Sequence, residues 1–419
     1  MGAVTARRHP SYMQDREATR RHRPDYLLLL LTVALSAIGV IVVFSISPAI
    51  SVEKGVDGNT YVYKQIFAVL LGLVIFAFAA AVPLGRWAKL YKPLLVLAAI
   101  MTLLALAMPV NADYPAHRWI RMAGFSFQSV EMLKFAGILW LAGFLSWRIK
   151  NGMMADEKQT LKPLFFVFIG VAVVVAGLQS DFGSFMVIVA IMGVMTFVAG
   201  LPVKKLLLAL AVLGIIGTIL ISAMPYRRDR LTAFMHPDCL NSGYQACQAL
   251  IAVGSGGMIG LGLGRSVQAY GYLPEAENDS IFAIYAEKFG FIGVTLLLGL
   301  FVAFFTRIKR IAERAPDDFS RLVVLGILVW LSCQTIINVG AMVGLLPLKG
   351  ITLPLVSYGG SSVLMVMAAL GVVFQISRHT LYSIPESDQI SNGGARSYDN
   401  NSNRRRVRGA YHPTPGRRA

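Results

Sequence analysis

Three carboxylates stand close together in the segment 272–283, directly before an apolar run long enough to be a helix. They belong to Glu275, Glu277 and Asp279. A carboxylate near a helix start feels the positive end of the helix dipole, which favours its ionised form and suits a general base or a cation ligand. The alternative is structural, because Asn278 or Asp279 could instead cap the free N–H groups of that helix. The residues alone leave both interpretations open.

Two further ionisable residues, Glu131 and Lys134, fall inside an apolar run, where a charge is costly without a partner. Their spacing of three residues places them on one face of a helix, so that they can form an ion pair. Such a pair is either an internal brace or the polar floor of a cavity open to the outer face. Asp181 lies in a short turn further along the chain. It either caps the following helix or lines the same cavity.

Two groups of arginines lie in the third loop and at the start of the long loop between the apolar runs. Arg118 and Arg121 flank Trp119, and a second group comprises Arg227, Arg228 and Arg230. Because arginine can bind phosphate oxygens with two N–H groups at once, both groups suit a lipid that carries a diphosphate. Salt bridges or contacts with lipid headgroups are the structural alternative.

The composition is that of a polytopic membrane protein. Of the 419 residues, 56% are hydrophobic and only 15% are charged, which effectively excludes a soluble enzyme. The net charge of +17 lies mostly between the apolar runs and in the tails rather than on a soluble domain. This placement favours anionic membrane lipids or a cytoplasmic partner over nucleic acid as the partner of the basic residues in the C-terminal tail.

Ten apolar runs reach the length of a bilayer crossing, taken as about 20 residues. The predicted fold is an all-α polytopic membrane protein with ten transmembrane helices, near residues 26–47, 63–82, 90–108, 130–147, 163–179, 183–200, 203–223, 281–306, 322–345 and 353–376. These helices form one domain, 26–377, with one long extracellular loop, 224–281, between helices seven and eight. The polar tails 1–25 and 378–419 are predicted to be disordered.

The basic residues also predict the orientation. Most Lys and Arg residues fall in the two tails and in the even-numbered loops. By the positive-inside rule both termini are cytoplasmic, and the long loop faces outward. No nucleotide-activated donor is expected on that face, so a reaction there needs a substrate that brings its own leaving group. Cys239 and Cys247 lie in this loop, where an oxidising environment permits a disulfide without requiring one.

The long loop is rich in glycine. Its glycines are Gly254, Gly256, Gly257, Gly260, Gly262 and Gly264. Their spacing does not match a dinucleotide-binding fingerprint, and they do not follow a strand. We expect a flexible or closely packed re-entrant segment instead.

Many short motifs occur in the order in which one known family carries them. In and around the long loop they are Tyr226-Arg227, Thr232-Ala233-Phe234, Gly243-Tyr244-Gln245, Gly262-Leu263-Gly264, Ser266-Val267-Gln268, Leu273-Pro274-Glu275, and Asp279 before Ile281-Phe282-Ala283. Outside it they are Arg118-Trp119-Ile120, Gln128 with Glu131 and Lys134, Gln179 with Asp181-Phe182-Gly183, and the segments 346–355 and 357–362. With these motifs the chain resembles the SEDS family of shape, elongation, division and sporulation proteins. The form of residues 349–354 is closer to the division branch than to the elongation branch.

This resemblance implies a ten-helix peptidoglycan glycosyltransferase of the cytoplasmic membrane that polymerises lipid II on the outer face, at the division site. It implies inverting transfer with release of undecaprenyl pyrophosphate, and a class B penicillin-binding protein and other division proteins as partners. Asp279 matches the essential catalytic carboxylate, as base or cation ligand, and a divalent cation, Mg or Mn, is implied near it. Glu277, which departs from the family pattern, is a candidate for a second acidic ligand of that cation. Substrate-binding positions are Arg118, Trp119, Arg121, Glu131, Lys134, Asp181, Arg227, Lys349 and Ser357. A lipid II transporter and a non-catalytic scaffold for the penicillin-binding protein are the alternatives.

The chain departs from the family pattern around Asp279. Glu277 and Asn278 stand where members often carry His-Thr, and Ser280 stands where they often carry Phe. The segment Ala286-Glu287-Lys288 replaces a frequent Gly-Glu-Glu. These differences leave Asp279 in place but leave the geometry of the cation open.

Overall fold

The computed structural model describes residues 18–21, 23–109, 117–122, 125–154, 156–205, 208, 211, 214, 239 and 243–382. The chain divides into two units, of which the larger is Arg21–Thr380 and the smaller joins Met1–Arg20 to Leu381–Ala419. The described helices are α1 (Tyr26–Glu53), α2 (Thr60–Ala81), α3 (Leu84–Ala107), α4 (Ser129–Lys150), α5 (Lys162–Val171) between the π-helical segments η1 (Glu157–Leu161) and η2 (Ala172–Leu178), α6 (Phe182–Val198), α9 (Tyr244–Ser255), α10 (Ile281–Glu313), α11 (Asp318–Met342) and α12 (Gly360–Ile376). Two short sheets pair β1 (Ala18–Arg21) with β4 (His379–Tyr382), and β2 (Trp119–Met122) with β3 (Phe125–Gln128).

The helices confirm an all-α polytopic membrane protein. Among the described residues, seven helices are long and apolar enough to cross a membrane, and α6 and α12 are apolar but shorter. The helix predicted at 203–223 lies largely outside the described residues, and so does Arg227.

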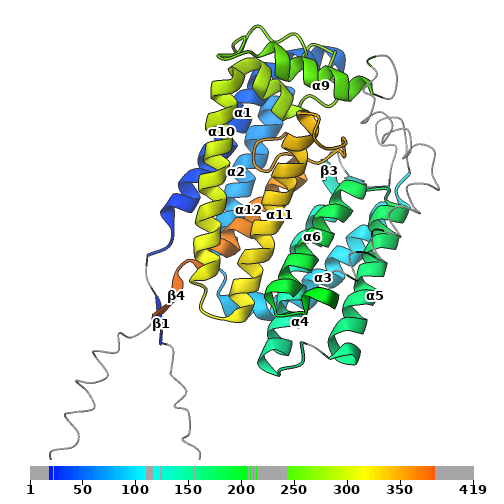
Figure 1. The fold of residues 1–419 in the computed structure, drawn as a ribbon. Helices are drawn as coiled ribbons and strands as arrows, with labels where there is room; N and C mark the ends of the chain where they lie inside the picture. The colour runs from blue at the N-terminus through cyan, green and yellow to red at the C-terminus, as the bar shows by residue number, and fades with distance from the viewer. Residues whose placement is uncertain are drawn as a thin grey trace, which may run out of the picture. The chain divides into compact units, whose positions relative to one another are not determined.

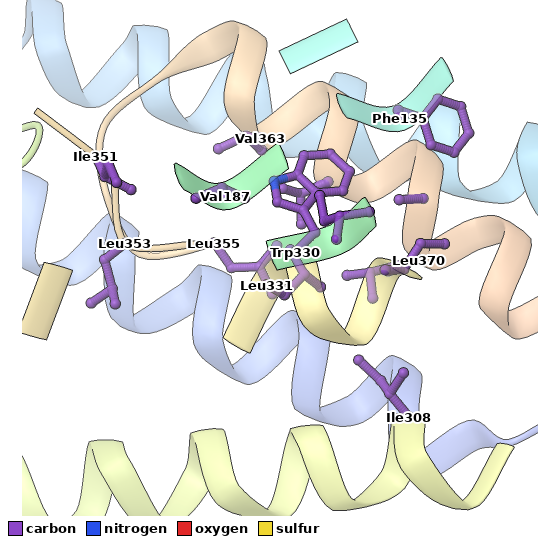
Figure 2. Packing of buried hydrophobic residues seen from close by; sticks show 14 of the residues in the cluster. Phe135, Val187, Ile308, Trp330, Leu331, Ile351, Leu353, Leu355, Val363 and Leu370 are labelled. Carbon is purple, nitrogen blue, oxygen red and sulfur yellow. The ribbon is translucent and has the colours of Figure 1, made fainter. Parts of the chain in front are cut away.

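Helix α11 lies at the centre of the larger unit, where it contacts α4, α6 and α10, while α12 lies along α2 (Figure 1). Trp330 of α11 is fully buried and belongs, with Val187 and Leu331, to the hydrophobic cluster (Figure 2). Helix α9 lies across the end of the bundle at which α10 begins. This arrangement brings the starts of α4, α6 and α10 close to the end of α11.

The last helix begins later in the chain than predicted. We expected it to start near Leu353, but α12 starts at Gly360. Pro354 has no backbone N–H to donate and disfavours a helical conformation in the residue before it. Leu355 has a φ of 66° and Gly350 a φ of 63°, both in the left-handed region. The first part of the apolar run is therefore an irregular segment, and the helix forms only from Gly360 onward.

Several elements were missing from the prediction. Helix α9 lies inside the predicted long loop, and the β2–β3 hairpin lies in the third loop, where Trp119 pairs with Gln128 and Arg121 with Ser126. Strands β1 and β4 fall in segments predicted to be disordered. Each of these strands finds its partner at the opposite end of the chain, so its own composition does not reveal the pairing.

Helix α10 is broken at Gly290, whose φ is 62° and ψ is −166°. The loop after α9 fills this break. Four backbone hydrogen bonds cross between them: Leu261 N to Glu287 O (2.9 Å), Gly262 N to Lys288 O (3.0 Å), Phe291 N to Gly257 O (2.9 Å) and Ile292 N to Met258 O (3.1 Å). The glycine-rich segment is thus closely packed, which was one of the two alternatives.

Candidate active site

The acidic segment ends at the start of α10. Ser280 is the N-cap residue of that helix, but its hydroxyl donates to Pro274 O (2.9 Å) instead of capping. The Asn278 side chain donates to the Glu275 carboxylate. Asn278 is therefore not the cap that we considered. Asp279 is half-buried, and its Oδ1 atom is fully buried.

Asn338 of α11 fixes the position of Asp279. Its Nδ2 atom donates to Asp279 O and to Ile351 O, both at 2.7 Å. The irregular segment before α12 therefore runs directly past Asp279. A methyl group on Gly350 would lie 3.7 Å from Asp279 Oδ2. The residues after Lys349 thus form one wall beside the carboxylate.

The same segment lies against the start of α6. A Cβ atom on Gly183 would be 2.8 Å from Lys349 O and 2.7 Å from Ile351 Cγ1, so only glycine allows this approach. Lys349 Nζ lies 5.6 Å from the centre of the Phe182 ring. The segment 349–351 therefore joins two predicted site regions, Asp279 and the start of α6.

Asp181 caps α6, which was one of its two predicted roles. Its Oδ1 accepts from Ser184 N (3.1 Å), and its Oδ2 accepts from Gln128 Nε2 (3.4 Å). Arg118 binds the turn before it, donating to Gln179 O (3.0 Å) and to Ser180 O (2.5 Å). The arginine and the carboxylate thus hold the same turn.

The predicted ion pair is present, with Lys134 Nζ 2.7 Å from Glu131 Oε1 and both side chains buried. Lys134 Nζ also lies 5.4 Å from the centre of the Trp330 ring. In the described part of the chain, several buried side-chain oxygens of α4, α11 and the turn before α6 have no hydrogen-bond partner: Glu131 Oε2, Gln179 Oε1, Gln334 Oε1 and Asn338 Oδ1. Buried polar atoms of this kind call for ordered water or a ligand.

The other predicted substrate-binding residues lie in different surroundings. Arg121 donates to Pro109 O, and Trp119 belongs to strand β2. Ser357 is buried, and its hydroxyl accepts from Leu353 N at 2.7 Å. This bond supports the irregular segment before α12. The substrate-binding roles of these residues remain predictions.

Sequence reasoning missed Lys54. Its ammonium group forms an ion pair with Glu277, with Nζ 3.0 Å from Oε1. Burial lowers the pKa of Lys54, but the Glu277 carboxylate more than offsets this, so the pKa lies above its ordinary value. Lys54 therefore stays charged. No local signal identifies this pair, because 223 residues separate its members.

Glu287 organises the loop that leads to the acidic segment. It is fully buried in α10. Its carboxylate accepts from Val267 N (2.8 Å), from Gln268 N (3.2 Å) and from the Ser266 hydroxyl. Such charge-assisted bonds are stronger than neutral ones, so Glu287 fixes the loop on the helix.

Replacing Glu287 with glutamine should loosen this loop. The amide oxygen can keep the two backbone donors that share Oε1, but its NH2 group replaces Oε2, so the Ser266 hydroxyl has to change from donor to acceptor and the negative charge that strengthens all three bonds is lost. We expect a loss of about 2–3 kcal/mol in unfolding free energy. Hydrogen exchange at the amides of residues 266–268 should accelerate. Glu313→Gln, at an exposed ion pair with Lys309, is the matched control and should change neither quantity. Unchanged exchange at 266–268 in the Glu287 variant would contradict this role.

The described side chains do not form a complete metal cage. Within the described ranges no group of three or more His, Cys, Asp or Glu side chains could hold a metal ion. Glu277 is engaged by Lys54. Mg²⁺, however, is often bound by one or two carboxylates together with substrate phosphates and water. Asp279 fits that arrangement, whereas Glu277 fits it only if Lys54 moves away.

A family model described as "Cell cycle protein" and named for FtsW, RodA and SpoVE matches residues 25–382. The chain belongs to this family. The match confirms the resemblance to the SEDS proteins, and it covers every described helix of the FtsW/RodA/SpoVE domain.

Two relatives and two solved structures illustrate the similarity to this family. A probable peptidoglycan glycosyltransferase FtsW of Saccharophagus degradans is 40% identical, covering 85% of this chain and 92% of the relative. The stage V sporulation protein E of Bacillus subtilis is 38% identical, covering 87% and 100%. The rod shape determining protein RodA of Thermus thermophilus has a TM-score of 0.62 at 26% identity, covering 86% and 98%. A structure described as the structural coordination of polymerization and crosslinking by a peptidoglycan synthase complex has a TM-score of 0.70 at 26% identity, covering 85% and 98%.

Proposed function

We propose that this FtsW-like chain polymerises lipid II into glycan strands on the outer face of the cytoplasmic membrane. It is an enzyme, a peptidoglycan glycosyltransferase, as are the relatives named FtsW. The observation that carries the proposal is the placement of Asp279. Asn338 and the segment 349–351 hold this half-buried carboxylate at the start of a membrane helix.

The reaction requires one proton transfer and one leaving group. The acceptor sugar hydroxyl attacks the anomeric carbon of the donor, so that a C–O bond forms as the bond to the lipid diphosphate breaks. Asp279 accepts the hydroxyl proton, and undecaprenyl pyrophosphate leaves with the bonding electron pair. A single displacement inverts the anomeric configuration, so no carboxylate nucleophile is needed.

Basic residues around the carboxylate suit the leaving diphosphate. Lys349 directly precedes the glycine beside Asp279, and Arg118 lies on the turn before α6. Segment 349–351, which contains Lys349, contacts both Asp279 and the start of α6, and Arg118 binds the turn directly before α6. Positive groups aimed at a developing diphosphate charge stabilise the transition state. We assign Lys349 to the diphosphate, and Arg118 primarily to holding the turn.

The proposed orientation places both termini in the cytoplasm and the acidic segment outside. A disulfide between Cys239 and Cys247, with Cα atoms 5.3 Å apart, supports this placement because disulfides persist in oxidising compartments. Ten spans and one long extracellular loop complete the topology, with the division site as its location.

The proposed partners are a class B penicillin-binding protein, other division proteins and membrane lipids. The similarity to a structure described as a peptidoglycan synthase complex for polymerization and crosslinking supports the first of these. A partner that crosslinks strands would receive the product of this chain at the membrane surface.

We also propose that the site takes a divalent cation, Mg or Mn, which the Asp279 carboxylate would help to hold. When bound, the ion would offset negative charge on the leaving group. Adding EDTA should therefore lower the polymerisation rate at least about tenfold. Restoring Mg²⁺ or Mn²⁺ should recover it, whereas Ca²⁺ should be less effective because of its larger size. A full rate in EDTA would show that basic side chains alone stabilise the diphosphate.

The experiment that tests the function uses purified full-length chain in liposomes with fluorescent lipid II and the penicillin-binding protein. Moenomycin-insensitive glycan strands should form. Transport is the rival function, and it is favoured by the buried Glu131–Lys134 pair and by the buried side-chain oxygens that lack hydrogen-bond partners in the described residues. A transporter would instead move lipid II between the two leaflets without forming glycan strands. Neither product nor movement, with a competent partner present, would favour a scaffold.

A further inference from the structure

The ion pair between Lys54 and Glu277 ties the acidic segment to a distant part of the chain. Lys54 directly follows α1, whereas Glu277 lies two residues before Asp279. The Glu277 side chain is only 5% exposed, but that of Lys54 is 49% exposed. A carboxylate as buried as Glu277 requires a partner, because an unpaired buried charge is strongly unfavourable. The lysine meets this need.

Two tyrosines support the same contact. Lys54 Nζ lies 5.4 Å from the centre of the Tyr61 ring, and that ring lies 5.3 Å from the ring of Tyr358. Tyr358 N in turn donates to Glu277 O at 2.8 Å. Glu277 is therefore held through its side chain by Lys54 and through its backbone by the segment before α12. The first contact comes from the residue after α1, and the second comes from the segment before α12.

A different contact holds the following turn. Asn338 binds the carbonyl of Asp279 from α11. The short segment between Glu277 and Asp279 is thus anchored from two directions, and only two peptide bonds separate the anchors. A displacement of Glu277 has to rotate the backbone at Asn278 and Asp279, which changes the direction of the Asp279 carboxylate.

We propose that Lys54 is a positioning residue of this active site, which holds Glu277 so that Asp279 points toward the reacting hydroxyl. The inference rests on the proposed glycosyl transfer. Lys54 also offsets the charge of Glu277 beside a site that receives an anionic diphosphate. Because Lys54 acts through Glu277, it affects the rate of the chemical step more than the binding of lipid II.

The test compares Lys54→Met and Lys54→Arg with wild type in the liposome assay. Misplacing a reacting group by about 1 Å can cost up to about 100-fold, so we expect Lys54→Met to lower the maximal rate about tenfold at a similar KM. Lys54→Arg keeps the charge and should retain at least about half the rate. The double variant Lys54→Met/Glu277→Gln should be no slower than Lys54→Met, because the buried charge is gone as well.

Lys64→Met is the matched control. It removes an exposed lysine from the first turns of α2, close in sequence to Lys54, and should leave the rate unchanged. A wild-type rate in Lys54→Met would overturn the proposal, as would equal losses in Lys54→Arg and Lys54→Met. A raised KM with an unchanged maximal rate would also overturn it, because Lys54 would then bind substrate directly.

Hydrogen exchange separates this inference from the proposed function. The amides of Asn278 and Ser280 both donate to Glu275 O (3.0 and 3.2 Å), so they report on the shape of the acidic segment. They should exchange about tenfold faster in Lys54→Met and at the wild-type rate in Lys64→Met. If the wild-type protein forms no glycan, the proposed function fails. Hydrogen exchange alone then tests whether Lys54 holds the acidic segment in place. Unchanged exchange in Lys54→Met would reject this role.

Discussion

Asp279→Asn should abolish lipid II polymerisation while leaving the protein folded. The amide has the same size but is not basic enough to accept the hydroxyl proton, and loss of a general base typically costs about 10²–10⁴-fold. The contact that places this residue survives, because Asn338 binds the backbone carbonyl and not the carboxylate. Strand synthesis in liposomes, with the penicillin-binding partner and a divalent cation, measures the rate.

The matched control for this substitution is Asp57→Asn. Asp57 lies in the turn between α1 and α2, where its exposed carboxylate accepts from Asn59 N at 3.2 Å. Polymerisation should proceed at the wild-type rate in this variant. If Asp279→Asn also polymerises lipid II at the wild-type rate, Asp279 has only a structural role and another group must be the base.

Gly260→Ala should have the largest effect on stability. Its φ is 83°, and a Cβ atom there would lie 2.1 Å from Lys288 O and 2.4 Å from Lys288 C. Both atoms belong to the backbone of α10, so relief requires the loop to leave the helix and break the hydrogen bonds that fill it. We expect a loss of more than about 4 kcal/mol. The midpoint of thermal unfolding in detergent should fall by roughly 5 °C or more.

Gly254→Ala tests whether any added methyl group in this region is harmful. Gly254 lies within α9, and nothing is found within 4 Å of a Cβ built on it. Alanine is the better helix former by about 0.5–1 kcal/mol, so this variant should be as stable as wild type or slightly more stable. A similar loss in both variants would mean that the close packing at Gly260 does not explain its effect.

Much of the fold follows from local composition. Helices α2 and α6 begin and end within three residues of their predicted limits, because each consists mainly of one long apolar run. The start of α12 was wrong, since hydropathy cannot distinguish the irregular apolar segment around Pro354 from a helix. Helix α9 is too short and too polar to be recognised as a membrane span.

The site shows the same division between local and distant contacts. The Glu131–Lys134 pair was predictable because a spacing of three residues places two side chains on one helical face. The pairing of Lys54 with Glu277 was not, because it depends on how α1 packs against α10. Asn338 carried an unused signal, since a polar side chain in an apolar helix usually has a partner to bind.

The loop that fills the break in α10 binds both halves of the helix. Its carbonyls at Gly257 and Met258 accept from residues after Gly290, and its N–H groups at Leu261 and Gly262 donate to residues before it. Separating them inside a membrane would leave polar backbone groups unsatisfied, at several kcal/mol each. The loop therefore holds the two halves of α10 in a fixed arrangement, so the break does not act as a hinge. The α10 side of the site is therefore a fixed wall, and a long lipid substrate has to enter without opening α10 at Gly290.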